Sequence, residues 1–322
     1  MVKWSISAIN QLRRCNRQYY FAQVAASHGR KNPFRREAYE LKSMQNLKMW
    51  PGSVVDTFIE KQIIPRIDEL TREDFPALAE EAVKLAEQQF RFSENLQYKD
   101  PDFSKSKTEA FAILQLHKLN QSYTRQELEE AYQKIRESIR NFPELYLPQT
   151  QQYLLEYLKE AGWKCPNVMN WSFEVNGAKV SPQIDLLLFY QNKPVIIDWK
   201  VSDSSTSDYS RQLLVCGLTV KNWNKNKAKQ NGTKPFKFED FTLMEVNLWN
   251  KTVKYHNFTQ EEANKTLDYI NLTASDLDLI LGGRKYDQIN IEEFDLTDKD
   301  TTCNICNFKS LCCATLQENY SL

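Results

Sequence analysis

Two short stretches of the chain carry residues that could perform hydrolytic chemistry. Asp198, Trp199 and Lys200 follow one another, and Asp185 lies thirteen residues earlier. Side chains alternate between the two faces of a strand, so Asp198 and Lys200 would share one face. Carboxylates prefer hard cations such as Mg²⁺ or Mn²⁺, and the backbone carbonyl of Trp199 could add a further oxygen ligand. The pattern predicts a metal site suited to phosphodiester hydrolysis, which needs neutralised phosphate charge and an activated water.

An aspartate two residues from a lysine is a weak signal by itself, since any exposed strand can carry that pair. The alternative is an ordinary surface ion pair between Asp198 and Lys200. Residues 195–197, Val-Ile-Ile, precede the pair and are typical of a buried strand. Because buried charges need partners, we favour a catalytic role for the pair.

A second cluster consists of cysteines. Four of the seven cysteines have spacing suited to a shared metal: Cys15, Cys303, Cys306 and Cys312. The last three form a C-x2-C-x5-C pattern, which permits either zinc or an iron–sulfur cluster. Closure of both chain ends on one metal would make folding depend on that metal. Cys313 falls outside the spacing, and Cys165 and Cys216 are expected to be small buried side chains.

Two basic stretches could contact a phosphate backbone. The candidate cations are Arg13, Arg14, Arg17, Lys221, Lys225, Lys227 and Lys229. The second stretch also contains Trp223 and Phe236, which could stack on a base. The alternative for residues 221–237 is a solvated, mobile loop. Nothing in the sequence predicts base-specific recognition.

The order of the possible site residues along the chain is more specific than any one motif. That order is Gly52, Asp56, Asp185, Asp198, Lys200 and Gln212. In this order the chain resembles the PD-(D/E)XK nuclease superfamily. With its cysteines it resembles the RecB-like branch that carries a C-terminal four-cysteine iron–sulfur cluster, as in AddB and the CRISPR adaptation nucleases. The resemblance covers the first sixty residues and nearly everything after Val168, and leaves the helical middle unexplained.

The resemblance implies roles for individual residues. Asp185 and Asp198 would bind Mg²⁺ or Mn²⁺, Lys200 would position or activate the attacking water, and Gln212 would lie near the site on the following helix. For the four cysteines it implies a [4Fe–4S] cluster. Its substrate would be DNA, with single strands or ends cut by an exonuclease, in repair, recombination or defence.

Two positions depart from the common pattern of that family. Asp56 stands where a histidine is usual, and Cys216 stands where a tyrosine follows the glutamine. An aspartate can still bind a hard cation through oxygen, so the first change preserves the chemistry. Both changes would also suit a non-catalytic DNA-binding or scaffold subunit of a helicase–nuclease or defence complex. No G-x4-G-K-[ST] loop is present, so unwinding would need a helicase partner.

The composition of the chain limits the classes of partner and the compartment that can be expected. The chain has 322 residues, with 42 Lys and Arg against 42 Asp and Glu, so no global positive charge attracts nucleic acid. The N-terminal residues lack a long apolar segment, and no apolar run could span a bilayer, which predicts a cytoplasmic protein without a membrane partner. In a reducing compartment, cysteines are metal ligands or free thiols before they are disulfides.

The periodicity of apolar residues predicts the elements that must position these groups. Helices are expected over residues 8–21, 37–48, 54–63, 75–90, 107–119, 124–142, 149–162, 207–220 and 261–280. Pro33 is expected to break any helix near it, and Thr124 and Glu127 have capping-box spacing. Strands are expected over residues 171–175, 179–190 and 194–201, joined by tight turns, and over 241–248 and 252–258.

Together these elements predict an α/β fold: a mixed central sheet flanked by helices, like a restriction endonuclease core, with a helical insertion and a metal-bound clasp of the termini. The expected organisation is N-terminal helices with the first cysteine and Asp56 over 1–65, a helical insertion over 66–165, the nuclease core over 166–260, and the C-terminal helix and cluster over 261–322.

Overall fold

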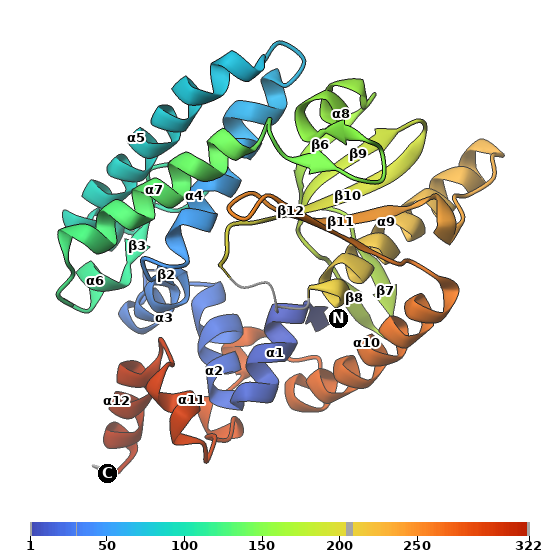
Figure 1. Cartoon of the computed structure of the whole chain (residues 1–322). Coiled ribbons are helices and arrows are strands. Elements are labelled where there is room, and N and C mark those ends of the chain that lie inside the picture. The colour runs from blue at the N-terminus through green and yellow to red at the C-terminus, as the bar shows by residue number, and fades with distance from the viewer. Residues whose placement is uncertain (1, 30, 204–208, 321–322) are drawn as a thin grey trace. The chain divides into compact units, whose positions relative to one another are not determined.

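The computed structural model describes residues 2–29, 31–203 and 209–320 (Figure 1). They form two compact units, each assembled from segments that are far apart in the sequence. The terminal unit comprises residues 1–46, 89–122 and 272–322, and the sheet unit comprises residues 47–88 and 123–271. A search of the described helices found none with the length and apolarity that a membrane span requires.

A five-stranded sheet is the centre of the sheet unit. Its strand order is β12-β11-β10-β9-β6, with β6 at Lys164–Val168, β9 at Ile184–Tyr190, β10 at Lys193–Lys200, β11 at Thr242–Asn247 and β12 at Thr252–His256. Strands β10 and β11 are parallel, whereas the other neighbours are antiparallel. Residues of β10 from Pro194 to Trp199 are buried, as suits a central strand. The prediction of a mixed sheet in an α/β fold is confirmed.

Two details of the strands differ from the prediction. The expected strand over 179–190 is divided into β8 (Ala178–Val180) and β9, and β8 pairs instead with β7 (Phe173–Val175). Asn176 and Gly177 make the turn between β7 and β8 with φ of 45° and 78°, which suits an Asn-Gly hairpin. Strand β6 was not predicted, because it lies at the sheet edge, contains Pro166 and lacks an alternating apolar pattern.

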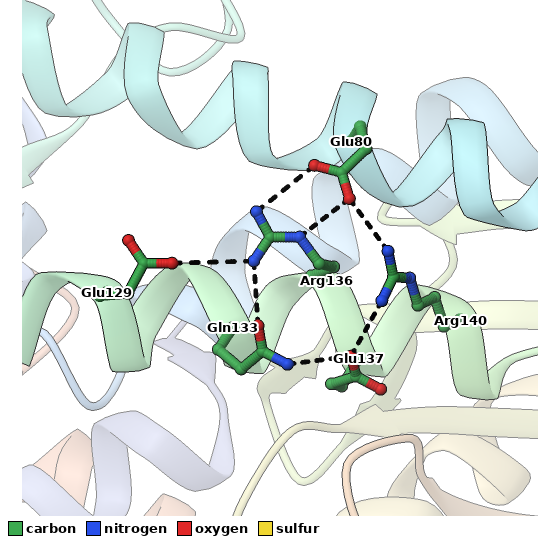
Figure 2. Close-up of polar contacts among 6 residues, drawn as sticks. All are labelled: Glu80, Glu129, Gln133, Arg136, Glu137 and Arg140. Atoms are coloured by element: carbon green, nitrogen blue, oxygen red, sulfur yellow. Dashed lines mark hydrogen bonds and ion pairs between the residues drawn. The ribbon is translucent and has the colours of Figure 1, made fainter.

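Helices α4 (Trp50–Phe58), α5 (Phe75–Glu94) and α7 (Arg125–Asn141) lie alongside one another in Figure 1. Thr124 and Glu127 form the expected capping box at the start of α7. A network of charged and amide side chains joins α7 to α5 (Figure 2). In it Arg136 Nε lies 2.9 Å from Glu80, and Arg140 lies 3.2 Å from the same carboxylate. These pairs are partly exposed, so each adds only about 0.2–1 kcal/mol to the packing of the two helices.

Helix α9 (Ser210–Asn231) follows β10 and is longer than predicted. The expected start at Ser207 lies outside the described residues. The helix continues past Val220 to Asn231, where Gly232 ends it in the left-handed region with φ of 68°. Residues 221–231, interpreted from the sequence either as a DNA contact or as a mobile loop, are therefore helical.

Several predicted helices are shorter or displaced. Residues 107–119 form only strand β3 (Ile113–Leu114) and the single turn α6 (Gln115–Lys118), because the Leu114 amide donates to Ser93 Oγ at 2.8 Å and β3 pairs with β2 (Met44–Gln45). Residues 149–162 form the end of a small hairpin, β4 (Tyr146–Leu147) with β5 (Gln152–Tyr153), and then α8 (Leu154–Glu160). Pairing between strands overrides helical periodicity in both segments.

Pro33 begins a helix rather than breaking one. Helix α3 spans Pro33–Ser43, and the Asn32 side chain accepts from the Arg35 amide at 3.1 Å. Proline is favourable at the first position of a helix, where its missing N–H has no partner to lose. The prediction of a break at Pro33 was wrong for this reason, and the helix predicted over 37–48 is present but begins earlier, at Pro33, and ends at Ser43.

The N-terminal segment of the terminal unit is interrupted where one helix was expected. Helix α1 spans Ile6–Arg14 and is capped by Ser5, and α2 spans Asn16–Tyr19. Cys15 between them is extended, with φ of −165° and ψ of 121°. The break frees the amide of Arg17 to donate to the carbonyl of Asp295 at 3.2 Å. Cys15 therefore lies in a junction between two helices and not within a helix.

The C-terminal segment packs on the N-terminal one inside the terminal unit. Helices α10 (Gln260–Leu281), α11 (Asp300–Asn304) and α12 (Lys309–Tyr320) follow one another along the chain. Phe308 is buried and stacks on Phe21 with ring centroids 5.6 Å apart. Asn307 Nδ2 donates to the carbonyl of Leu41 at 3.2 Å. Apolar packing and a hydrogen bond thus hold residues 307–308 against Phe21 and Leu41.

Candidate active site

The two aspartates of the motif meet at neighbouring strands of the sheet unit. Asp185 is the second residue of β9, and Asp198 lies near the end of β10. The antiparallel pairing places Leu186 opposite Ile197, so Asp185 and Asp198 are the next residues to face each other on the two neighbouring strands. The Trp199 amide donates to Asp185 Oδ2 at 3.0 Å, which fixes this carboxylate against β10. The sheet thus brings together two residues that the sequence separates by a hairpin.

Asp198 is held by two further side chains. Its Oδ2 forms an ion pair with Lys200, as expected for residues on one face of a strand. Its Oδ1 accepts from Gln212 Nε2 at 2.9 Å, and Gln212 comes from the first turn of α9. Lys200 Nζ also lies 4.1 Å from the centroid of the Tyr209 ring. Asp185, Asp198, Lys200 and Gln212 therefore form one connected cluster.

Burial and charge set the protonation of this cluster. Burial first, and the charge of Asp198 second, raise the pKa of Asp185 to about 7. Burial also raises the pKa of Asp198, although Lys200 acts in the opposite direction. Burial lowers the pKa of Lys200, but the two carboxylates outweigh it and the net pKa is raised. Lys200 is therefore an ammonium near neutral pH, suited to positioning water and stabilising negative charge.

The opposite side of β10 is apolar. Trp199 is buried and its ring centroid lies 5.7 Å from that of Phe142 on α7. On the side of the cluster, Cys216 lies one turn after Gln212 on α9 and is also buried, with Sγ 3.8 Å from the carbonyl of Gln183. Burial raises the pKa of the Cys216 thiol, and the two aspartates raise it further. Cys216 is thus a neutral packing residue beside the cluster.

Sequence reasoning missed two residues next to the cluster. Glu245 on β11 is directly opposite Asp198 in the parallel register and is only 6% exposed. His256 on β12 places Nε2 3.6 Å from Glu245 Oε2, and Lys254 Nζ lies 3.7 Å from Glu245 Oε1. A glutamate within the apolar run Leu243-Met-Glu-Val246 was the signal that could have drawn attention to it.

Asp56 lies in a different environment from the other two carboxylates. It is an exposed residue of α4, whereas Asp198 is 5% exposed. Within residues 2–29, 31–203 and 209–320, no three or more His, Cys, Asp or Glu side chains are arranged to hold a metal ion. The structure therefore does not assemble Asp56, Asp185 and Asp198 into a three-carboxylate site. The roles of Asp56 and of the Trp199 carbonyl as metal ligands stay predictions.

The residues present nevertheless fit a divalent cation. Mg²⁺ is commonly bound through one or two protein carboxylates, with waters and substrate phosphate completing its shell. Asp185 and Asp198 provide two adjacent carboxylates, and burial followed by their mutual repulsion raises the pKa of Asp185. A cation between them would relieve that repulsion, which is the usual electrostatic reason for a metal at paired carboxylates.

The four cysteines are neighbours in the terminal unit. Cys303 lies in α11, Cys306 in the following turn and Cys312 in α12, and all four are partly exposed. Burial raises the pKa of Cys306, and the proximity of Cys15 and Cys303 raises it further. Burial likewise raises the pKa of Cys312 to about 11, with Cys15 and Cys306 adding to the effect. The thiols interact, but among the described residues they are not arranged as a metal-binding group.

The predicted nucleic-acid contacts have different environments. Arg17 is only 7% exposed, and its Nε donates to the carbonyl of Phe294 at 3.1 Å. Its guanidinium therefore anchors the C-terminal segment, and its assignment as a phosphate contact was wrong. Lys221 is also engaged, donating to the carbonyl of Phe236 at 2.7 Å. The remaining candidates are exposed: Arg13, Arg14, Lys225, Lys227 and Lys229.

Comparison with known proteins decides the family. The sequence model of the PD-(D/E)XK nuclease superfamily matches residues 3–313. The chain belongs to this superfamily. Members of the PD-(D/E)XK superfamily are typically nucleases that use divalent metals such as Mg²⁺. The match also includes the helical middle that the motifs left unexplained. A search of curated proteins found no match.

Proposed function

We propose that this PD-(D/E)XK protein is a deoxyribonuclease dependent on Mg²⁺ or Mn²⁺, of the RecB-like branch, that cuts single-stranded DNA or DNA ends as an exonuclease. The observation that carries the proposal is the connected cluster of Asp185, Asp198, Lys200 and Gln212 on two adjacent strands and one helix. A helicase would supply unwound substrate in trans.

Asp185 and Asp198 would hold the divalent ion, with Asp56 and the Trp199 carbonyl as further proposed ligands. The ion, when bound, would neutralise phosphate charge and lower the pKa of a water. The Lys200 ammonium would orient the attacking water and balance charge that develops on the phosphate. Gln212 holds Asp198 in place through its hydrogen bond to Oδ1. The rigid strands β9 and β10 keep these groups in a fixed geometry.

We also propose that Cys15, Cys303, Cys306 and Cys312 hold a [4Fe–4S] cluster, with zinc as the alternative metal. Support comes from their spacing and from their mutual effect on thiol pKa values within the terminal unit. A metal bound by these cysteines would add a second link between the N- and C-terminal segments of this unit, which the stacked rings of Phe308 and Phe21 already join.

The exposed C-terminal half of α9 is the proposed path of the DNA backbone. Lys225, Lys227 and Lys229 are exposed on its C-terminal half. Lys227 Nζ lies 4.7 Å from the Trp223 ring, and Trp223 stacks on Trp171 with centroids 4.1 Å apart. Cations beside stacked aromatic rings suit a single strand without sequence preference. Arg13 and Arg14 would add phosphate contacts in the terminal unit.

The decisive experiment uses protein purified without oxygen and end-labelled single- and double-stranded DNA, with Mg²⁺ or Mn²⁺. We expect cleavage of single strands, lost by at least about a hundredfold in Asp198→Asn, which keeps the size of the side chain but removes its charge. Asp268→Asn removes an exposed carboxylate of α10 and serves as the matched control. Wild-type turnover in Asp198→Asn would disprove the assignment of the site.

A non-catalytic DNA-binding subunit is the second candidate, favoured by the exposed Asp56 and the buried Cys216. It predicts a protein that binds DNA, cuts no substrate with either metal and shows no divalent-ion binding by calorimetry. That result would replace the nuclease assignment.

A further inference from the structure

A cavity of about 620 Å³ lies within the terminal unit, and none of the residues assigned above to catalysis or to the cysteine cluster lines it. Its walls come from the N-terminal strand, the segment before α3, the start of α3, and the segment that follows α10. The volume is within the range of pockets that bind small ligands, roughly 300–1,000 Å³. The cavity is therefore large enough for a nucleotide.

The lining of the cavity is strongly positive in a chain without net charge. Four cations line it, Lys3, Arg35, Arg284 and Lys285, against one acid, Asp287. The Arg284 side chain already has protein partners. It donates to the carbonyls of Leu281 and Ile280 at the end of α10 and forms an ion pair with Glu293. Lys3, Arg35 and Lys285 form no ion pair with a carboxylate in the part of the chain that the structure describes. These three charges are available for an anion.

The lack of a side chain at Gly29 leaves room for the Arg35 side chain. Gly29 has φ of 66°, and a Cβ atom there would lie 3.0 Å from Arg35 Cδ. Only glycine allows the arginine stem to lie this close to the backbone at this conformation. The Asn32 cap fixes the Arg35 amide at the start of α3.

An aromatic pair lies in the same lining. The rings of His28 and Tyr286 are in contact, with centroids 4.8 Å apart and an angle of 46° between their planes. Tyr286 is half-buried, whereas His28 is exposed, so the pair offers a supported ring surface to a ligand. Base stacking on an aromatic side chain contributes about 1–3 kcal/mol, and it tolerates any base because each has a π face.

We infer that this cavity binds one nucleotide of a single-stranded nucleic acid, with its phosphate at Lys3, Arg35 and Lys285 and its base on the ring pair of His28 and Tyr286. This inference rests on the proposed function, because the cavity would bind the nuclease substrate at a site separate from the catalytic cluster. A free nucleotide shares the same chemistry. The sequence has no G-x4-G-K-[ST] loop to cradle a triphosphate, which favours a strand.

The test measures binding of a fluorescein-labelled oligothymidylate to the full chain by anisotropy, in EDTA, over a series of salt concentrations. Arg35→Ala and Lys285→Ala should each raise Kd about tenfold, because hydrogen bonds to charged groups contribute roughly that much. Each should also reduce the slope of log K against log salt by about 0.7, the value for one phosphate contact on a single strand. Lys299→Ala removes an exposed lysine of the same unit outside the cavity and should leave both quantities unchanged.

The aromatic pair has its own test. His28→Ala should raise Kd about tenfold with an unchanged salt slope, whereas His28→Phe keeps a ring and should bind like the wild type. Equal losses in Lys299→Ala and Lys285→Ala, or unchanged binding in all cavity variants, would overturn the site. Thymidine 5′-monophosphate binding as tightly as the oligonucleotide would overturn the assignment to a strand.

The test separates this proposal from the proposed function. Binding is measured without divalent metal, so a protein that binds through the cavity but never cuts contradicts only the nuclease assignment. A protein that cuts DNA but binds it equally well in every cavity variant contradicts only this site.

Discussion

The carboxylate–lysine cluster of the sheet unit and the cysteine cluster of the terminal unit differ in how their polar groups are satisfied. Asp185 and Asp198 already have protein partners: the Trp199 amide, Lys200 and Gln212. The cysteines have no disulfide bonds, and burial raises the pKa values of Cys306 and Cys312. The first cluster is assembled by the fold, whereas the second is brought near by apolar packing and would be completed by a metal.

The two clusters therefore differ in what fixes the positions of their side chains. Adjacent strands fix side-chain positions through their backbone hydrogen bonds, so the aspartates are ordered before any ligand arrives. The cysteines lie on short helices and turns that are held by Phe308 and Phe21. Metal binding to thiolates is folding free energy for such segments, since the ligand set forms only with the metal.

The largest effect should come from removing one cysteine of the terminal unit. Cys306→Ala in metal-loaded protein should lose the bound metal and destabilise the terminal unit by several kcal/mol, because a structural four-ligand metal contributes about 10–16 kcal/mol in small domains. Metal analysis, visible absorption and thermal unfolding measure this change. Cys313→Ala, next to the predicted ligand Cys312 but exposed, is the matched control.

Equal metal content in Cys306→Ala and wild type would contradict the metal assignment. Stoichiometric zinc without iron would contradict the iron–sulfur assignment alone, and it would leave the comparison between the two clusters intact.

Loss of the lysine should be the largest change in the sheet unit. Lys200→Met should destabilise the metal-free protein by about 3–5 kcal/mol, because it leaves buried carboxylates without their positive partner. Chemical denaturation measures this cost, and added Mn²⁺ should recover part of it by replacing the lost charge. Lys254→Met, at a lysine that is 41% exposed, should cost less than about 1 kcal/mol. A neutral effect of Lys200→Met would show that the cluster does not depend on internal pairing.

The raised pKa of Asp185 predicts a pH dependence of stability. The folded protein binds this proton up to about pH 7, whereas the unfolded chain releases it near the usual value of 3.8. Stability of the metal-free protein should therefore fall as pH rises from about 4 to 7, by an amount on the order of a few kcal/mol. Asp185→Asn should flatten that slope.

Divalent metal should reverse the pH trend, because binding requires both carboxylates to be ionised. We expect Mn²⁺ to raise the unfolding temperature more at pH 8 than at pH 6. An equal shift at both pH values, or an unchanged slope in Asp185→Asn, would show that Asp185 is not the titrating group.

The smallest effect concerns the hydrogen bond from α9. Gln212→Leu removes the donor to Asp198 Oδ1 and should cost about 1–3 kcal/mol of stability, the penalty for a buried acceptor without a partner. Cleavage should fall about tenfold as Asp198 becomes less fixed. Gln260→Leu, at an exposed position of α10, is the control and should change neither quantity. An effect of Gln212→Leu on stability but not on cleavage would limit the role of this residue to the fold.

Residues close in the sequence or on one strand were predictable. The period-two rule placed Asp198 and Lys200 on one face, and the Asn-Gly and capping signals located the β7–β8 turn and the start of α7. These features depend on local backbone geometry, which a short stretch of sequence specifies. The predictions failed where a distant segment of the chain supplies the partner. Arg17 was assigned to DNA, but the helix is interrupted at Cys15 and the Arg17 side chain donates to the carbonyl of Phe294.

The sequence by itself thus determined the mixed α/β fold and the shared face of Asp198 and Lys200, since both follow from periodicity, and the order of its motifs carried the resemblance to the superfamily. Only the tertiary structure decided that Glu245 lies opposite Asp198, that Asp56 is exposed, and that Lys3, His28 and Tyr286 line one cavity. The physical reason is that strand register and the packing of distant segments are set by long-range contacts. A single sequence carries no local signal for those contacts.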